Sequence, residues 1–85
     1  MAPFTEAIRR LSSTDGGVVF DLRSGRMFRV NQLGARVLDL MEHGDSPAQI
    51  ALKLSVEFQV ALTEVQTDVG EFVESLKLLG VITSL

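Results

Sequence analysis

The sequence predicts an α+β domain in which a small antiparallel sheet is followed by three helices. Short β-branched and aromatic runs separated by turn dipeptides occupy the first 30 residues. Apolar side chains then recur three times at helical spacing, and capping residues precede them. The chain has 85 residues and shows no linker, internal repeat or low-complexity tract. We therefore expect one domain over residues 1–85, with its core at about 7–83.

Three strands are expected in the N-terminal part. The first, about Ala7–Ser12, is ambiguous, because its apolar residues also recur at helical spacing; the Ser, Thr and Gly residues that follow favour a short strand. Asp15-Gly16 is a hairpin-turn dipeptide, and Gly17–Leu22 is a β-branched and aromatic run. Ser24-Gly25 marks a second turn, and Arg26–Val30 forms the third strand. These segments predict a three-stranded meander.

The third strand alternates in character. Phe28 and Val30 fall on one face of the sheet, and Met27 and Arg29 fall on the other. No strand follows until the last few residues, so this strand is expected at the edge of the sheet, with backbone groups open to a partner. Asn31 is an N-cap candidate, because its side-chain oxygen can accept an amide of the next helix's first turn.

The first two helices carry clear start and stop signals. The first is expected from Gln32 to about Glu42, with one apolar stripe, and Gly44 can take the left-handed position that ends it. The second begins at Ser46-Pro47-Ala48-Gln49, in which Ser46 is the N-cap, Pro47 the first helical residue and Gln49 the partner in a capping box. The two helices are therefore joined by a short connection.

The third helix is expected to start at Thr63-Glu64-Val65-Gln66, which repeats the capping-box pattern, and to run to about Leu79. Gly80 ends it. The last segment, Val81-Ile82-Thr83, either adds a brief strand or packs as an apolar tail.

Composition sets limits on location and chemistry. The chain has no cysteine, which excludes disulfides and thiolate chemistry. Its N-terminus lacks the basic-then-apolar order of a signal peptide, and no apolar run approaches the roughly 20 residues that span a bilayer. A soluble, cytoplasmic protein without membrane contact is expected.

The net charge of −3 hides an asymmetry. Residues 1–36 contain six arginines and three acids, giving +3, and residues 37–85 contain two lysines and eight acids, giving −6. A polarised partner would experience a directional field. An ordinary solvated surface is an equally good interpretation.

Catalysis is poorly supported. One histidine and no cysteine or tyrosine leave few acids, bases or nucleophiles. His43 is interpreted as a helix-end residue, and the acids spaced three apart on the third helix (Asp68, Glu71, Glu74) as its solvated or partner-facing side. No phosphate-binding loop is present. We expect a protein that is not an enzyme and has no cofactor and no metal.

The order of three strands and three helices, with two helices closely joined, resembles a winged helix-turn-helix. The sequence also resembles the PqqD-like family over about residues 7–83. Two departures are Met27-Phe28 where the family often has two aromatics, and Val30 where it has Leu. The chain also lacks the Trp and Pro-Glu features of the pyrroloquinoline quinone chaperone, so it is more similar to stand-alone recognition elements of lasso-peptide or radical-SAM peptide pathways. The motifs that carry the resemblance are Gly16–Asp21, Ser24–Asn31, Gly34-Ala35, Asp68-Val69, Phe72-Val73, Leu76 and Gly80–Ile82.

The resemblance implies a non-catalytic adaptor. In that family the leader of a ribosomally made precursor peptide adds as a strand to the third strand, in a cleft closed by the third helix. The implied partners are a precursor leader peptide and a modifying enzyme, either a leader peptidase or a radical-SAM enzyme; a dimer through the free edge strand stays open. The implied leader-binding residues are Arg26, Met27, Phe28, Arg29 and Val30 on the strand and Val65, Asp68, Val69, Phe72 and Leu76 on the helix.

The main alternative is a winged-helix regulator that binds DNA. Such a fold brings a helix close to phosphates and needs a basic outer face on it. The third helix instead carries four acids against Lys77 alone, so it would repel a duplex, and no nucleic-acid partner is expected. A purely structural role inside a larger complex is a third hypothesis.

Overall fold

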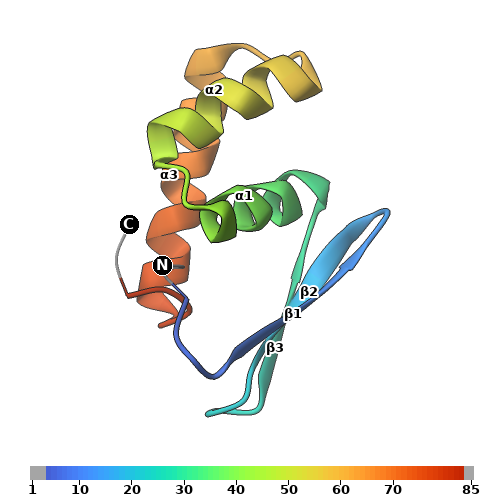
Figure 1. Cartoon of the computed structure of the whole chain (residues 1–85), viewed down its shortest axis with the longest axis vertical. Coiled ribbons are helices and arrows are strands. Elements are labelled where there is room, and N and C mark those ends of the chain that lie inside the picture. The colour runs from blue at the N-terminus through green and yellow to red at the C-terminus, as the bar shows by residue number, and fades with distance from the viewer. Residues whose placement is uncertain (1–3, 84–85) are drawn as a thin grey trace.

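The computed structural model describes residues 4–83 and contains a three-stranded antiparallel sheet followed by three helices, which confirms the predicted α+β, winged helix-turn-helix-like fold. Figure 1 shows the helices gathered on one side of the sheet. Helix α1 packs against β2 and β3, and α2 packs against both other helices. The elements are β1 (Ile8–Ser13), β2 (Gly16–Asp21), β3 (Arg26–Val30), α1 (Gln32–His43), α2 (Pro47–Phe58) and α3 (Leu62–Leu78).

The sheet has the order β1-β2-β3, with both pairs antiparallel. The ambiguous first segment is a strand, as favoured, although it starts at Ile8 and reaches Ser13. The second strand ends at Asp21, one residue earlier than predicted. The Asp21 carboxylate accepts the Arg23 backbone N–H at 3.0 Å, which turns the chain out of the sheet.

The caps predicted for α1 and α2 are confirmed. The Asn31 side chain accepts from the Gly34 N–H, and Gly44 takes a left-handed conformation with φ 99° after the helix. Ser46 and Gln49 form a reciprocal capping box, and Pro47 occupies the first turn. These local signals fix where the two helices begin and where α1 ends.

The predicted capping box at Thr63 is wrong. Helix α3 begins one residue earlier, at Leu62, after Ala61, and no side chain caps it. The Val65 N–H already bonds to the Ala61 carbonyl at 3.1 Å, which places Thr63 inside the first turn. A hydroxyl inside the turn cannot serve as the N-cap. At the other end Gly80, with φ 75°, follows the helix as expected.

The core lies between the helices and the inner face of the sheet. The C-terminal segment joins it, because Val81 and Ile82 are buried and Ile82 forms an isolated antiparallel bridge with Phe4. The segment therefore both packs as an apolar tail and makes a brief strand-like contact, so each of the two predicted alternatives holds in part. No helix within residues 4–83 is long and apolar enough to cross a membrane. The side chains with 2% exposure or less include Val19, Val37, Leu38, Met41, Ile50, Leu54, Val65 and Val69.

Candidate functional site

Strand β3 has a neighbour on one side only, and the register shows which of its backbone groups are free. The Leu22 N–H donates to the Ala7 carbonyl at 3.0 Å, just beyond the paired ends of β2 and β1. In an antiparallel sheet the backbone groups of successive residues point alternately to the two neighbouring strands. Phe20 therefore also bonds to β1, and the residues between, Val19 and Asp21, bond to β3.

On β3, Val19 pairs with Phe28 and Asp21 pairs with Arg26. Phe28 and Arg26 consequently use their N–H and C=O groups within the sheet. Met27 and Arg29, which alternate with them, direct theirs away from β2, to a side where the described chain offers no strand. An extended peptide would find its main-chain partners at these two residues.

The side chains of β3 divide as the alternation predicted. Phe28 and Val30 are half-buried and pack against the core on the inner face. Met27 is 55% exposed and lies on the outer face, away from the helices. The Arg26 guanidinium lies 5.9 Å from the Phe28 ring centroid, a cation–π contact. Met27 thus offers its backbone groups to the open edge, while its side chain lies on the outer face, away from the helices.

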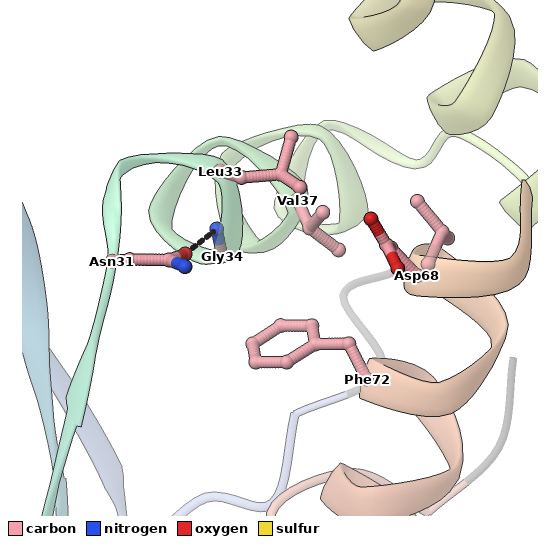
Figure 2. Close-up of a pocket in the computed structure, with 7 residues that line it drawn as sticks. Asn31, Leu33, Gly34, Val37, Asp68 and Phe72 are labelled. Carbon is pink, nitrogen blue, oxygen red and sulfur yellow. Dashed lines mark hydrogen bonds between the residues drawn. The ribbon is translucent and has the colours of Figure 1, made fainter. Parts of the chain in front are cut away.

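Beyond the end of β3, a groove with a volume of about 300 Å³ lies between α1 and α3. Figure 2 shows the Phe72 ring extending from α3 towards Asn31 and Gly34 at the start of α1, with the Asp68 carboxylate facing α1 one turn earlier. Leu33, Val37 and Phe72 thus supply apolar walls (Figure 2), and the Asn31 amide and the Asp68 carboxylate are the polar groups of the lining. The groove is lined by Asn31, Leu33, Gly34, Val37, Asp68, Val69 and Phe72.

A glycine keeps this groove open at the α1 wall. The Asn31 cap accepts the Gly34 N–H at 2.8 Å and so holds Gly34 at the base of the first turn. A Cβ on Gly34 would lie 3.3 Å from the Val30 Cβ and 3.4 Å from the Phe72 Cζ. A side chain at this position would therefore contact the Phe72 ring and crowd Val30, whereas glycine leaves this part of the groove open.

The predicted α3 residues fall into two groups. Phe72 is half-buried and Asp68 is exposed, and both line the groove. Val65, Val69 and Leu76 are 1%, 2% and 4% exposed and belong to the core. Of these three only Val69 also lines the groove, while Val65 and Leu76 support the helix from behind.

Sequence reasoning missed the α1 side of the groove. The sequence predicts Asn31 only as a helix cap, and it predicts the apolar stripe of this helix without a role in binding. A signal was present, because Gly34 interrupts a helix in its first turn, where glycine lowers helix stability. Such a glycine indicates close approach of another group, here the Phe72 ring.

The rim of the site carries unneutralised charge. Among the described residues, the Asp68 carboxylate and the Arg26 guanidinium have no ion-pair partner. By contrast, Arg36 binds Glu57 through two N–H groups at 2.9 and 3.0 Å, and this pairing lowers the pKa of Glu57. No group of three metal-ligating side chains is gathered within residues 4–83.

The opposite edge of the sheet is different in character. A second groove, of about 460 Å³, lies between β1 and α1. Arg10 lies in it and forms ion pairs with Asp39 and Glu42, the latter at 2.7 Å. Arg10 and the two acids of α1 are thus engaged with each other, whereas the β3 side presents apolar walls and free charges.

An open strand edge beside an apolar groove is the arrangement of domains that bind an extended peptide as an added strand. The chain belongs to the PqqD family: the family model described as "Coenzyme PQQ synthesis protein D (PqqD)" matches residues 16–82. A comparison with curated proteins gave no match.

Two solved structures are similar over nearly the whole chain. One, described as "Lasso peptide synthetase B1 complexed with the leader peptide", has a TM-score of 0.82 and 31% identity, and the match covers 91% of each chain. The other, "TbiB1 in Complex with the TbiA(beta) Leader Peptide", has a TM-score of 0.86, and the match covers 96% of this chain and 94% of that one. At 24% identity the second shows a shared fold.

Proposed function

We propose that the protein is a non-catalytic adaptor that binds the leader of a ribosomally synthesised precursor peptide and delivers it to a modifying enzyme. The observation that carries the proposal is the open edge at Met27 and Arg29 directly beside the groove between α1 and α3. Membership of the PqqD family supports it, as does the similarity to a structure described as lasso peptide synthetase B1 complexed with the leader peptide.

The leader lies along β3 and pairs with the backbone of Met27 and Arg29. Alternate leader side chains then point to the inner side of the sheet. Those side chains contact Phe28 and Val30, and an apolar leader residue beyond the strand enters the groove against Phe72. Val69 forms the floor, and Val65 and Leu76 hold α3 in place without touching the peptide.

Charges at the rim select the register of the leader. The free Asp68 carboxylate accepts from a hydroxyl or cationic side chain of the leader, and Arg26 pairs with an acidic one. Because both groups are exposed, they change association rate and specificity more than affinity.

Binding at β3 is favoured over binding at β1 by the contacts already present. A peptide at the β1 edge would meet Arg10, whose ion pairs to Asp39 and Glu42 it would have to break or avoid. At the β3 edge neither Arg26 nor Arg29 forms an ion pair with a residue of the range 4–83, so an added strand would break none there. The apolar walls there also supply the burial that main-chain hydrogen bonds alone do not.

The adaptor acts by proximity. Holding the leader raises the effective concentration of the attached core peptide at the active site of a bound enzyme, without chemistry of its own. The enzyme is a leader peptidase or a radical-SAM enzyme, and no residue of this chain needs to enter the reaction.

The test is an NMR titration of labelled protein with the leader half of the short reading frame nearest the gene. Backbone shifts are expected at Arg26–Val30 and around Phe72, saturating at about micromolar concentration. Shifts on duplex DNA with none from the leader would instead support the winged-helix regulator.

A pair of variants at one position tests strand addition itself. Met27→Pro removes an N–H that faces the open edge and leaves the bonds to β2 intact. Met27→Ala removes only an outward side chain. We expect leader affinity to fall at least about tenfold for the proline variant and to change little for the alanine variant. Equal affinity for both would refute pairing at β3.

A further inference from the structure

The sheet has a second face, which no helix of the described chain covers. All three helices lie on the other side (Figure 1). The register places six side chains on this outer sheet face, in two rows that cross the three strands. The rows are Arg9, Phe20 and Met27, and Leu11, Val18 and Arg29.

The outer sheet face is apolar at its centre. Leu11 is 64% exposed and Met27 55%, and Val18 and Phe20 between them are half-buried. Leu22, just beyond the end of β2, is 60% exposed. A contiguous apolar surface of this kind on a small protein marks an interaction site more often than scattered single residues do.

Positive charge lies at two opposite corners of this face. Of the six arginines, Arg10, Arg23 and Arg36 are paired with carboxylates. Arg9 donates only to backbone carbonyls, those of residues 6 and 8, and Arg29 has no carboxylate partner within residues 4–83. None of the six side chains of the face is acidic. The matching surface is therefore apolar at its centre and acidic at its rim.

We propose that the outer sheet face is the docking surface for the modifying enzyme, which contributes an apolar patch bordered by Asp and Glu. This inference rests on the proposed adaptor function. A leader strand added to β3 would extend the same sheet, so its outward side chains would lie next to Met27 and Arg29 and within the same interface. One face of the sheet then binds the enzyme, and the open edge binds the leader.

The charges and the composition disfavour other occupants. A two-fold contact between two copies of this face would bring arginines against arginines, and none of the six side chains of the face is acidic; the Asp15 carboxylate borders the face beside Leu11 and Arg29. A nucleic acid would meet four apolar side chains and only two cations, on a protein with a net charge of −3. An acidic-rimmed protein surface satisfies both the apolar centre and the cations.

The experiment uses the purified modifying enzyme encoded beside the gene and the full chain with Leu11→Asp. Leu11 lies on β1, two strands away from the edge that binds the leader. Val56→Asp is the matched control, because Val56 is 73% exposed on α2 and its replacement adds the same charge elsewhere. Enzyme binding is measured by calorimetry with and without leader, leader binding is measured separately, and NMR spectra report folding.

We expect Leu11→Asp to weaken enzyme binding at least about tenfold with leader affinity unchanged, and Val56→Asp to alter neither. Arg9→Glu should also weaken enzyme binding, and its loss of affinity relative to wild type should increase as the ionic strength falls. Unchanged enzyme binding by folded Leu11→Asp would overturn the inference, as would a wild-type dimer that this substitution dissociates. The two proposals can fail separately. If the wild-type protein does not bind the leader, yet Leu11→Asp weakens enzyme binding, the docking surface is supported and the leader-binding function is refuted.

Discussion

Gly34 and Phe72 meet across the groove, one on α1 and the other on α3, so closely that a methyl group on the glycine would touch the ring. Gly34→Ala should therefore narrow the groove. The added Cβ would lie 3.3 Å from the Val30 Cβ, which must move by a few tenths of an ångström, and 3.4 Å from the Phe72 ring, which it would contact. We expect leader affinity to fall about tenfold, equivalent to about 1.4 kcal/mol, in a calorimetric titration.

The same substitution at another helical glycine is the matched control. Gly70 lies in α3, is exposed, and a Cβ there would meet nothing within 4 Å. Gly70→Ala should raise the free energy of unfolding by about 0.5–1 kcal/mol, because alanine loses less backbone entropy in a helix. Leader affinity should stay at the wild-type value. A fall in affinity for Gly70→Ala as large as that for Gly34→Ala would contradict the groove.

Phe72 and its neighbour Val73 separate binding from stability. Phe72 is half-buried in the groove wall, whereas Val73 is 6% exposed in the core. Phe72→Ala should reduce leader affinity at least about tenfold, since an aromatic anchor in a pocket carries much of a peptide's binding energy. Val73→Ala should lower the free energy of unfolding by about 1–2 kcal/mol and leave affinity unchanged. Urea denaturation and leader titration of both variants check this. A leader affinity of Phe72→Ala equal to that of Val73→Ala would exclude Phe72 from the site.

The open edge could be predicted from the sequence, because turns, caps and alternation are local. The strand β3 lies between the Ser24-Gly25 turn and the Asn31 cap, and the alternation of Met27 with Phe28 assigns these two side chains to opposite faces. What alternation does not give is the direction of the backbone groups, which depends on how β2 pairs with β1. That pairing separates the side chain of Met27, on the outer face, from its N–H, on the open edge.

Only the α3 wall of the groove could be predicted from the sequence. Phe72 and Asp68 followed from the family resemblance, whereas the α1 wall depends on how closely two helices approach through Gly34. The cap at Thr63 is a predicted feature that the structure does not contain. Its Thr-Glu-Val-Gln pattern matches a capping box, yet the helix already begins at Leu62, and its N-cap position is Ala61, two residues before Thr63.

Arg36 connects α1 to α2, and its geometry is specific to a guanidinium. It binds both Glu57 oxygens and also Asp39 at 3.2 Å. Arg36→Lys should lower the free energy of unfolding by about 0.5 kcal/mol, because a single ammonium cannot replace the two-pronged contact and the pair is partly exposed. The loss should shrink in high salt. Thermal unfolding at two ionic strengths measures it, and a salt-independent loss would point to packing rather than charge.

Asp21 provides the pH dependence of stability. Its carboxylate is buried at the end of β2 and accepts Nε and Nη2 of Arg23 at 3.1 Å, and Arg23 continues to the Gly80 carbonyl at 3.0 Å. Hydrogen bonds from the Arg23 side chain lower the pKa of Asp21 from 3.8 to about 2. Because the folded state holds the proton less tightly than the unfolded chain, the stabilisation is fully present above about pH 4 and is lost as the pH falls towards 2.

Asp21→Asn should therefore lower stability at neutral pH and converge with wild type near pH 2. Arg23→Met should remove the same acid dependence, since it takes away the donors that hold the carboxylate ionised, and adding Asp21→Asn to it should cost little more. Urea denaturation between pH 2 and pH 7 measures all four proteins. Parallel curves for wild type and Asp21→Asn would show that Asp21 keeps an ordinary pKa and that the tie between the β2–β3 turn and the end of α3 does not depend on its charge.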